Sequence, residues 1–214
     1  MVNVKVCGVT NKEDAECAVS NGADYIGFIF APSKRKIIKE TALRIKKEIP
    51  DFDRYVGVFL NGKKKEIEEI CEFAGIRIIQ LHGDETPAFC NYFINRGYNV
   101  IKVFRVRDQR SFDAVRQYDK VDAFLFDTYK TGQYGGTGEA FDWSIIKRIP
   151  FVQGRDFFIS GGLDQTNVSR VVSSLKPFGV DASSKLEIRP GYKDHEKVRE
   201  FIAHAKGVGY DASH

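Results

Sequence analysis

The sequence lacks closely paired cysteines and closely paired histidines. Its cysteines stand far apart, at Cys7, Cys17, Cys71 and Cys90. Most of its histidines lie near the C-terminus, and none belongs to an H-E-x-x-H motif. These absences exclude the common zinc-binding and dithiol redox motifs, so we expect neither a bound metal nor a cofactor.

Long apolar runs and charge of a single sign are also absent. No apolar stretch is long enough to span a bilayer, and Lys5, Lys12 and Glu13 occupy the region where a secretory leader has its apolar core. The 33 basic and 29 acidic side chains are interleaved, so the net charge of +4 forms no stripe for a nucleic acid. We therefore expect a reduced, cytoplasmic protein that binds neither membrane nor nucleic acid and whose mild positive charge favours an anionic metabolite.

What the sequence does contain is a recurrent unit, in which a short apolar run and a turn precede a charged amphipathic stretch. Several of the apolar runs lack polar alternation, which is typical of strands buried on both faces of a parallel sheet. The predicted strands are Asn3–Cys7, Tyr25–Phe30, Arg54–Leu60, Ile76–Leu81, Val100–Val106, Ala123–Asp127, Phe157–Ser160 and Val180–Ala182. The predicted helices are Lys12–Ser20, Glu40–Ile49, Lys63–Ala74, Thr86–Arg96, Ser111–Tyr118, Trp143–Arg148, Thr166–Leu175 and Lys193–Ala205.

Regular alternation of strands and helices predicts an α/β fold with a parallel sheet. Eight units fit a single-domain (β/α)8 TIM barrel that spans residues 1–214, with short loops because the chain is short for this fold. Asn11 and the pair Asn61–Gly62 are predicted to start the first and third helices. The alternative is an open doubly wound sheet, but its dinucleotide-binding form carries a G-x-G-x-x-G motif that this chain lacks after the first strand.

Active sites of TIM barrels lie at the C-terminal ends of the strands, where Cys7 and Asp127 stand. Cys7 ends the first strand beside Gly8, and is either a reactive thiol or a small buried core residue. Asp127 ends an apolar strand. A partly buried carboxyl there can act as an acid near neutral pH, whereas an exposed one would only cap a helix or lie in a loop.

Other polar residues follow further strand ends. Arg35, in a basic loop, suits a carboxylate through paired hydrogen bonds, although the loop can equally be an ordinary solvated one. Gln80 and His82 flank a leucine, so both are expected to face the barrel mouth. A metal-binding role for His82 is weakly supported, because no other histidine is near it in the sequence.

The loops after the seventh and eighth strands are rich in small residues. In TIM barrels these two loops commonly bind phosphate through backbone N–H groups and a helix N-terminus. The residues that predict this site are Gly161, Gly162, Ser183 and Ser184. Another glycine-rich segment, Thr131–Gly138, lacks the Gly-Lys-Ser/Thr ending of a P-loop, and we interpret it as a lid.

With these motifs in view, the chain resembles the phosphoribosylanthranilate isomerase family over nearly its whole length. The matching segments are Lys5–Thr10, Ser33–Arg35, Val56–Phe59, Gln80–Glu85, Phe126–Asp127, Gly135–Gly138, Phe141–Trp143, Ser160–Leu163, Gly179–Ser184 and Pro190–Asp194. Each segment is modest alone, but their order and number are specific. The resemblance implies a TIM barrel enzyme of tryptophan biosynthesis that acts on a small phosphoribosyl substrate, without a cofactor, as a monomer or homodimer.

The resemblance also implies roles for individual residues in an Amadori rearrangement. Asp127 matches the general acid that opens the ribose ring, and Cys7 matches the general base that removes the C2 proton. Arg35 would hold the anthranilate carboxylate, with Gln80, His82 and Asp181 also lining the substrate site. The phosphate would bind at Gly161, Gly162, Ser183 and Ser184. The chain departs from the family pattern at Lys34, Lys185 and Leu186, none of which is a proposed catalytic residue.

Two alternatives remain open at this point. Aminoimidazole-carboxamide ribotide isomerase runs the same rearrangement with two aspartates, and the cysteine at position 7 argues against it. The other alternative is a catalytically silent protein that binds a phosphorylated metabolite on the same barrel. The presence of both Cys7 and Asp127 argues against this second alternative.

Overall fold

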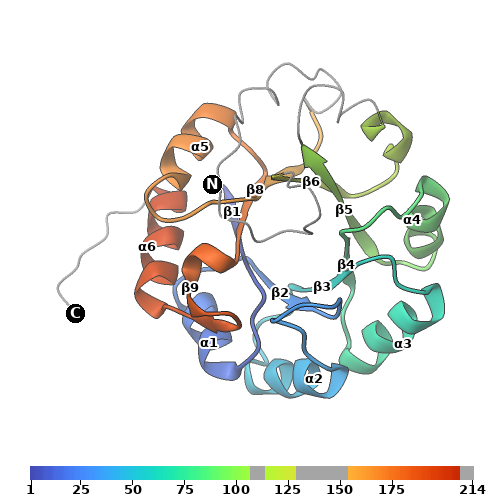
Figure 1. The fold of residues 1–214 in the computed structure, drawn as a ribbon, viewed down its shortest axis with the longest axis horizontal. Helices are drawn as coiled ribbons and strands as arrows, with labels where there is room; N and C mark the ends of the chain where they lie inside the picture. The colour runs from blue at the N-terminus through green and yellow to red at the C-terminus, as the bar shows by residue number, and fades with distance from the viewer. Residues whose placement is uncertain (107–113, 129–153, 208–214) are drawn as a thin grey trace.

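Eight parallel strands close into a barrel in a computed structural model that describes residues 1–106, 114–128 and 154–207. Each strand pairs with the next along the chain, and β8 pairs back with β1 (Figure 1). The strands are β1 Asn3–Cys7, β2 Tyr25–Ile29, β3 Tyr55–Phe59, β4 Ile78–Leu81, β5 Asn99–Val106, β6 Ala123–Thr128, β7 Phe157–Ile159 and β8 Gly179–Ala182. The predicted TIM barrel is therefore confirmed, while its extent as one domain over residues 1–214 stays a prediction.

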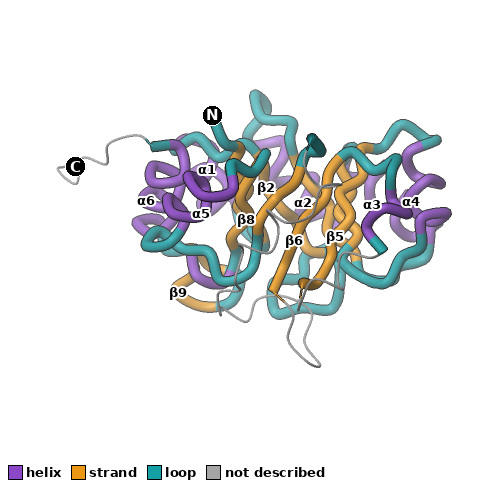
Figure 2. Tube along the Cα trace, turned by 90° about the horizontal axis from the view of Figure 1, so that it is seen from above, coloured by secondary structure: helices purple, strands orange, loops and turns teal. Residues whose placement is uncertain are grey.

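Helices surround the barrel on the outside, and Figure 2 shows them flanking the central strands. The described α-helices are α1 Lys12–Ser20, α2 Lys39–Glu48, α3 Lys64–Ala74, α4 Pro87–Ile94, α5 Val168–Leu175 and α6 His195–Lys206. Short 3-10 helices cover Val115–Tyr118 and Ser184–Leu186. The predicted helix Trp143–Arg148 and the glycine-rich segment Thr131–Gly138 lie outside the described residues.

Of the two predicted start signals, Asn11 caps its helix, whereas Asn61 does not cap the third helix. The side chain of Asn11 accepts a hydrogen bond from the backbone N–H of Asp14 at 2.8 Å and caps α1. Helix α3 instead begins after Lys63, without a side-chain cap. Asn61 adopts a left-handed φ of 50°, and its side-chain oxygen accepts from the N–H of Asp84 at 2.7 Å. Asparagine tolerates this left-handed conformation. The hydrogen bond of Asn61 to Asp84 joins the loop after β3 to the loop after β4.

A short antiparallel hairpin follows β8, and the sequence did not predict it. Strand β9 covers Glu187–Arg189 and β10 covers Tyr192–Lys193. The turn between them contains Pro190 and Gly191, a local turn signal. Because β10 includes Lys193 and Asp194 caps the last helix, α6 begins two residues later than predicted.

Alternation along the strands separates the interior of the barrel from its outer layer. The larger apolar cluster lies between strands and helices. A smaller cluster fills the inside of the barrel with Val56, Ile101, Val103, Ala123, Leu125 and Phe158. On β6, Ala123 and Leu125 belong to this smaller cluster, and Asp127 is the next residue on the same face of the strand. The period of two thus places a carboxylate above the apolar residues of β6, at the open end of the barrel.

Candidate active site

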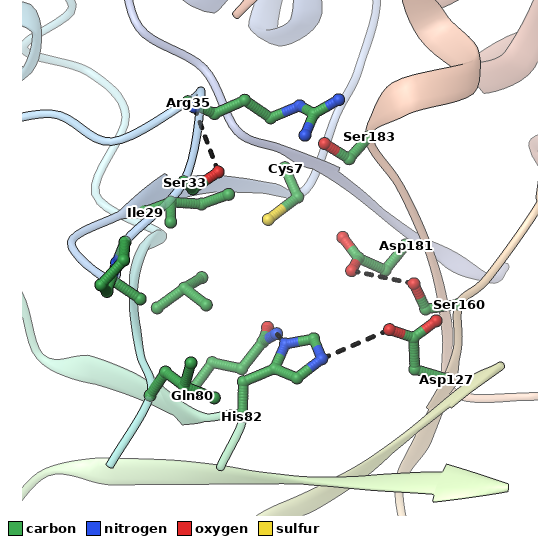
Figure 3. Close-up of a pocket in the computed structure, with 14 residues that line it drawn as sticks. Cys7, Ile29, Ser33, Arg35, Gln80, His82, Asp127, Ser160, Asp181 and Ser183 are labelled. Atoms are coloured by element: carbon green, nitrogen blue, oxygen red, sulfur yellow. Dashed lines mark hydrogen bonds and ion pairs between the residues drawn. The ribbon is translucent and has the colours of Figure 1, made fainter. Parts of the chain in front are cut away.

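A cavity of about 670 Å³ opens at the C-terminal ends of the strands (Figure 3). The lining residues include every catalytic and substrate-binding residue predicted from the sequence, namely Cys7, Arg35, Gln80, His82, Asp127 and Asp181. Side chains from separate loops and strands therefore converge on one space.

Cys7 and Asp127 point into this cavity from different walls, as Figure 3 shows. Cys7 is 5% exposed and Asp127 is 3% exposed. Burial raises the pKa of the Cys7 thiol, while the ammonium of Lys5 acts in the opposite direction. Burial likewise raises the pKa of two thiols in the outer layer, to about 12 for Cys71 and about 11 for Cys90.

A fully buried lysine lies directly below the thiol and was not singled out from the sequence. Lys5 Nζ lies 2.9 Å from Oδ1 of Asp181, its neighbour across the β1–β8 pairing. Lys5 also precedes Cys7 by two residues, so both side chains face the interior of the barrel. A lysine two residues before Cys7, within a mainly apolar strand, was the sequence signal that could have identified it.

A polar chain links Gln80, His82 and Asp127 across the cavity. The Gln80 amide donates to Nδ1 of His82 at 3.3 Å, which leaves the proton of a neutral imidazole on Nε2. Nε2 in turn lies 3.3 Å from Oδ2 of Asp127, an electrostatic contact that lacks hydrogen-bond geometry. The other amide atom of Gln80, Oε1, is buried and has no hydrogen-bond partner among the described residues. Such an unsatisfied acceptor is suited to a polar group on a ligand.

The guanidinium of Arg35 is held by Glu187 from the hairpin. Nε and Nη2 of Arg35 each donate to Glu187, both at 2.7 Å, and this pairing raises the pKa of Arg35. Lys193 donates to Glu187 as well at 3.1 Å, and to the carbonyls of Cys7 at 2.7 Å and Ser183 at 3.2 Å. Sequence reasoning missed both Glu187 and Lys193, which tie the end of β1 to the loops after β2 and β8.

Glycine is required at position 8 for two independent reasons. Gly8 has a left-handed φ of 74°, and a Cβ there would lie 2.7 Å from Cδ of Arg35 and 2.9 Å from Oγ of Ser183. Any side chain would therefore push these two groups away from the strand end.

A second hollow of about 270 Å³ adjoins the cavity and is formed by the loops after β7 and β8. All four residues predicted to bind phosphate line it, namely Gly161, Gly162, Ser183 and Ser184. The exposed Lys185 lines it too and supplies positive charge. Ser160, which lines both hollows, donates to Asp181 at 3.4 Å and was not among the predicted site residues.

A buried ion pair supports the loop that carries His82. Lys102 Nζ donates to Glu85 at 2.8 Å and to the carbonyls of Leu81 at 3.2 Å and Gly83 at 2.7 Å. The Lys102 and Glu85 side chains are 3% and 2% exposed. The loop therefore depends on this pair for its conformation.

We expect Lys102→Met to lower the free energy of unfolding by about 3–5 kcal/mol, because it leaves a buried carboxylate without its cation. Denaturant titration measures this loss. The matched control is Lys12→Met, since Lys12 pairs with Glu16 at 3.2 Å on the surface. An equally small effect in both variants would show that the buried pair does not hold the loop.

Comparison with known proteins identifies the family of the chain. The sequence model of the family described as N-(5'phosphoribosyl)anthranilate (PRA) isomerase matches residues 4–204. The chain belongs to this family. It is 44% identical over 209 residues to the PRA isomerase of Citrifermentans bemidjiense, covering 97% of this chain and 98% of that one. The PRA isomerase of Thermotoga maritima is 42% identical over 213 residues, covering 97% and 100%.

Solved structures of PRA isomerases superpose on the whole barrel. The Thermotoga maritima enzyme has a TM-score of 0.90 at 42% identity, covering 97% of this chain and 100% of that chain. A PRA isomerase in complex with reduced 1-(o-carboxyphenylamino)-1-deoxyribulose 5-phosphate has a TM-score of 0.87 at 39% identity, with the same coverage. By contrast, 3-hexulose-6-phosphate synthase of Salmonella typhimurium, at 15% identity and a TM-score of 0.69, shares the fold alone.

Family membership makes the chain a PRA isomerase of tryptophan biosynthesis, as the sequence predicted. The same family membership confirms the prediction that the chain is an enzyme. Within the described ranges, no helix is long and apolar enough to cross a membrane. The individual roles of the site residues stay predictions.

Proposed function

We propose that the chain converts N-(5'-phosphoribosyl)anthranilate into 1-(2-carboxyphenylamino)-1-deoxyribulose 5-phosphate by a metal-free Amadori rearrangement. The observation that carries the proposal is that Cys7 and Asp127 face one cavity whose wall continues into the glycine- and serine-lined hollow. A thiol base, a carboxyl acid and a candidate phosphate site are thus within reach of one small substrate. The PRA isomerase solved with a reduced form of this product gives independent support.

In the first step, Asp127 protonates the ring oxygen of the ribose. The ring oxygen is a poor leaving group until it is protonated, so a positioned acid is needed. Cleavage of the C1–O bond then gives the open-chain Schiff base. His82 lies beside the acid, with its Nε2 3.3 Å from Oδ2 of Asp127.

In the second step, the thiolate of Cys7 removes the proton from C2. The adjacent iminium acidifies this carbon, so a thiolate can deprotonate it without a metal. The electron pair moves to the C1–C2 bond and neutralises the nitrogen, which gives an enolamine. Loss of the O2 proton and protonation of C1 then produce the ketone.

Other groups of the cavity orient the substrate around these two residues. The phosphate binds in the hollow formed by the loops after β7 and β8, and Asp181 lines the sugar site beside Ser160. The anthranilate carboxylate binds Arg35 through the guanidinium donors that Glu187 does not occupy. Gln80 contributes its unsatisfied oxygen to the same cavity.

We expect Arg35→Met to raise KM by about 10- to 100-fold with a smaller change in kcat, because a charged hydrogen bond to a non-reacting group is lost. Steady-state kinetics separates the two constants. Arg54→Met is the control, since Arg54 lies just before β3 at the opposite end of the barrel. An unchanged KM in Arg35→Met would show that Arg35 does not bind the anthranilate carboxylate.

Turnover tests the proposed reaction itself. Phosphoribosylanthranilate is generated freshly, and loss of its fluorescence is followed with the unaltered protein in the presence of a metal chelator. We expect rapid loss and a product whose NMR spectrum is that of the aminodeoxyribulose phosphate. No loss with folded protein, or loss that the chelator abolishes, would refute the metal-free rearrangement.

The cellular setting is proposed on chemical grounds. The substrate is a small metabolite and the four cysteines are free, which suits a reducing cytoplasm. We propose a monomer or a homodimer that binds neither nucleic acid nor membrane. Among solved relatives, the Thermotoga maritima enzyme is described as dimeric and has been obtained as monomers.

A further inference from the structure

A charged pair is enclosed in the barrel beneath the proposed base. Lys5 is 0% exposed and Asp181 is 5% exposed, and their ion pair spans 2.9 Å. Burial tends to lower the pKa of Lys5, but Asp181 and Cys7 outweigh burial and raise it. The lysine is therefore held as a cation in a place that water does not reach.

Gly27 lets this cation approach the thiol. Gly27 pairs with Cys7 across β1 and β2, and its missing side chain would point into the barrel. A Cβ at this position would lie 2.7 Å from Sγ of Cys7 and 3.1 Å from Nζ of Lys5. Thiol and ammonium therefore both border the small space that a bare glycine leaves open.

From this arrangement we propose that Lys5 is a positioning residue that promotes ionisation of Cys7. The proposal rests on the proposed function, in which Cys7 acts as the base. A buried thiol loses the hydration that stabilises its thiolate, and a fixed cation nearby replaces part of it. Asp181 keeps the lysine charged, and Gly27 keeps the path between ammonium and sulfur free.

Other charged groups near Cys7 interact mainly with partners other than its sulfur. Lys193 approaches from the hairpin, but its ammonium binds the Cys7 carbonyl and Glu187. Arg35 approaches from the loop after β2 and is paired with Glu187 as well. Asp127 and His82 stand farther along the cavity wall and interact with each other. Lys5 therefore has the clearest electrostatic access to the sulfur.

The test measures ionisation of the thiol rather than catalysis. The rate of iodoacetamide modification at Cys7, resolved by peptide mass mapping, is recorded against pH. Iodoacetamide is uncharged, so changes in local charge do not alter its encounter with the site. In Lys5→Met we expect the midpoint of this profile to move upward by about one to two pH units, since one nearby cation is lost.

A second variant guards against loss of folding. Lys5→Met alone leaves Asp181 as an unpaired buried carboxylate, whereas Lys5→Met combined with Asp181→Asn removes both charges. We expect the double variant to fold and its midpoint also to exceed that of the unaltered protein, without exceeding that of Lys5→Met. Lys102→Met is the matched control, since Lys102 is a buried strand lysine paired with a carboxylate in the outer layer. Its Cys7 profile should match the unaltered protein.

The outcomes separate this proposal from the reaction mechanism. Coincident profiles for the unaltered protein and the folded double variant would overturn the role of Lys5, even if Cys7→Ala is inactive. An equal shift in Lys102→Met would also overturn it, because any buried lysine would then have the same effect. Near-normal turnover of Cys7→Ala would instead refute Cys7 as the base, whatever the alkylation profiles show.

Discussion

Cys7→Ala is expected to lower kcat by about 10²–10⁴-fold or more, because the proposed base for the C2 proton is lost. The thiol is small and the cavity is otherwise unchanged, so affinity for the product should stay within about tenfold. Fluorescence-monitored turnover and calorimetric titration of the product measure the two effects separately.

The matched control for this variant is Cys17→Ala, since Cys17 lies on α1 and does not line the cavity. It should turn over normally. A catalytically silent binding protein would bind the product but show no turnover before or after either substitution. Near-normal turnover in Cys7→Ala would remove the thiol from the mechanism.

Asp127→Asn is expected to abolish turnover to a similar extent, about 10²–10⁴-fold, because an amide cannot protonate the ring oxygen. Shape is preserved, so product affinity should again remain within about tenfold. Single-turnover kinetics should show no ring opening, and therefore no later intermediate.

Asp84→Asn provides the control for charge at the rim of the barrel. Asp84 is exposed and pairs with Arg105 at 2.7 Å in the loop after β4. Its substitution should leave kcat within about twofold, since surface pairs contribute little. If Asp84→Asn were as inactive as Asp127→Asn, the loss would reflect general electrostatics and not a specific acid.

The strands could be predicted because a strand buried on both faces leaves a continuous apolar run in the sequence. Apolar runs such as Ala123–Leu125 reflect strands covered on both faces, and each predicted strand overlaps an observed one. Strand ends could be located to within two residues, which was enough to bring Cys7 and Asp127 to one rim. The short hairpin was missed because β9 and β10 have only three and two residues and, unlike the three-residue β7, are not apolar runs.

The network around the site could not be predicted, because its partners are distant in sequence. Lys5 meets Asp181 only when β8 closes the barrel against β1. Glu187 reaches Arg35 through the hairpin, and the interpretation of Arg35 from sequence did not include this competing carboxylate. Asn61 looked like a helix start, but its oxygen was already engaged by the neighbouring loop.

The central claim is that a proton leaves C2 of the substrate by way of Cys7. The most direct test uses phosphoribosylanthranilate deuterated at C2 and follows the label by NMR through turnover by the unaltered protein. We predict that the label appears in water, because the thiol exchanges its hydrogen with solvent before the next turnover. Quantitative transfer of the deuterium to C1 would contradict this prediction, since the label would then pass from C2 to C1 without exchange with water.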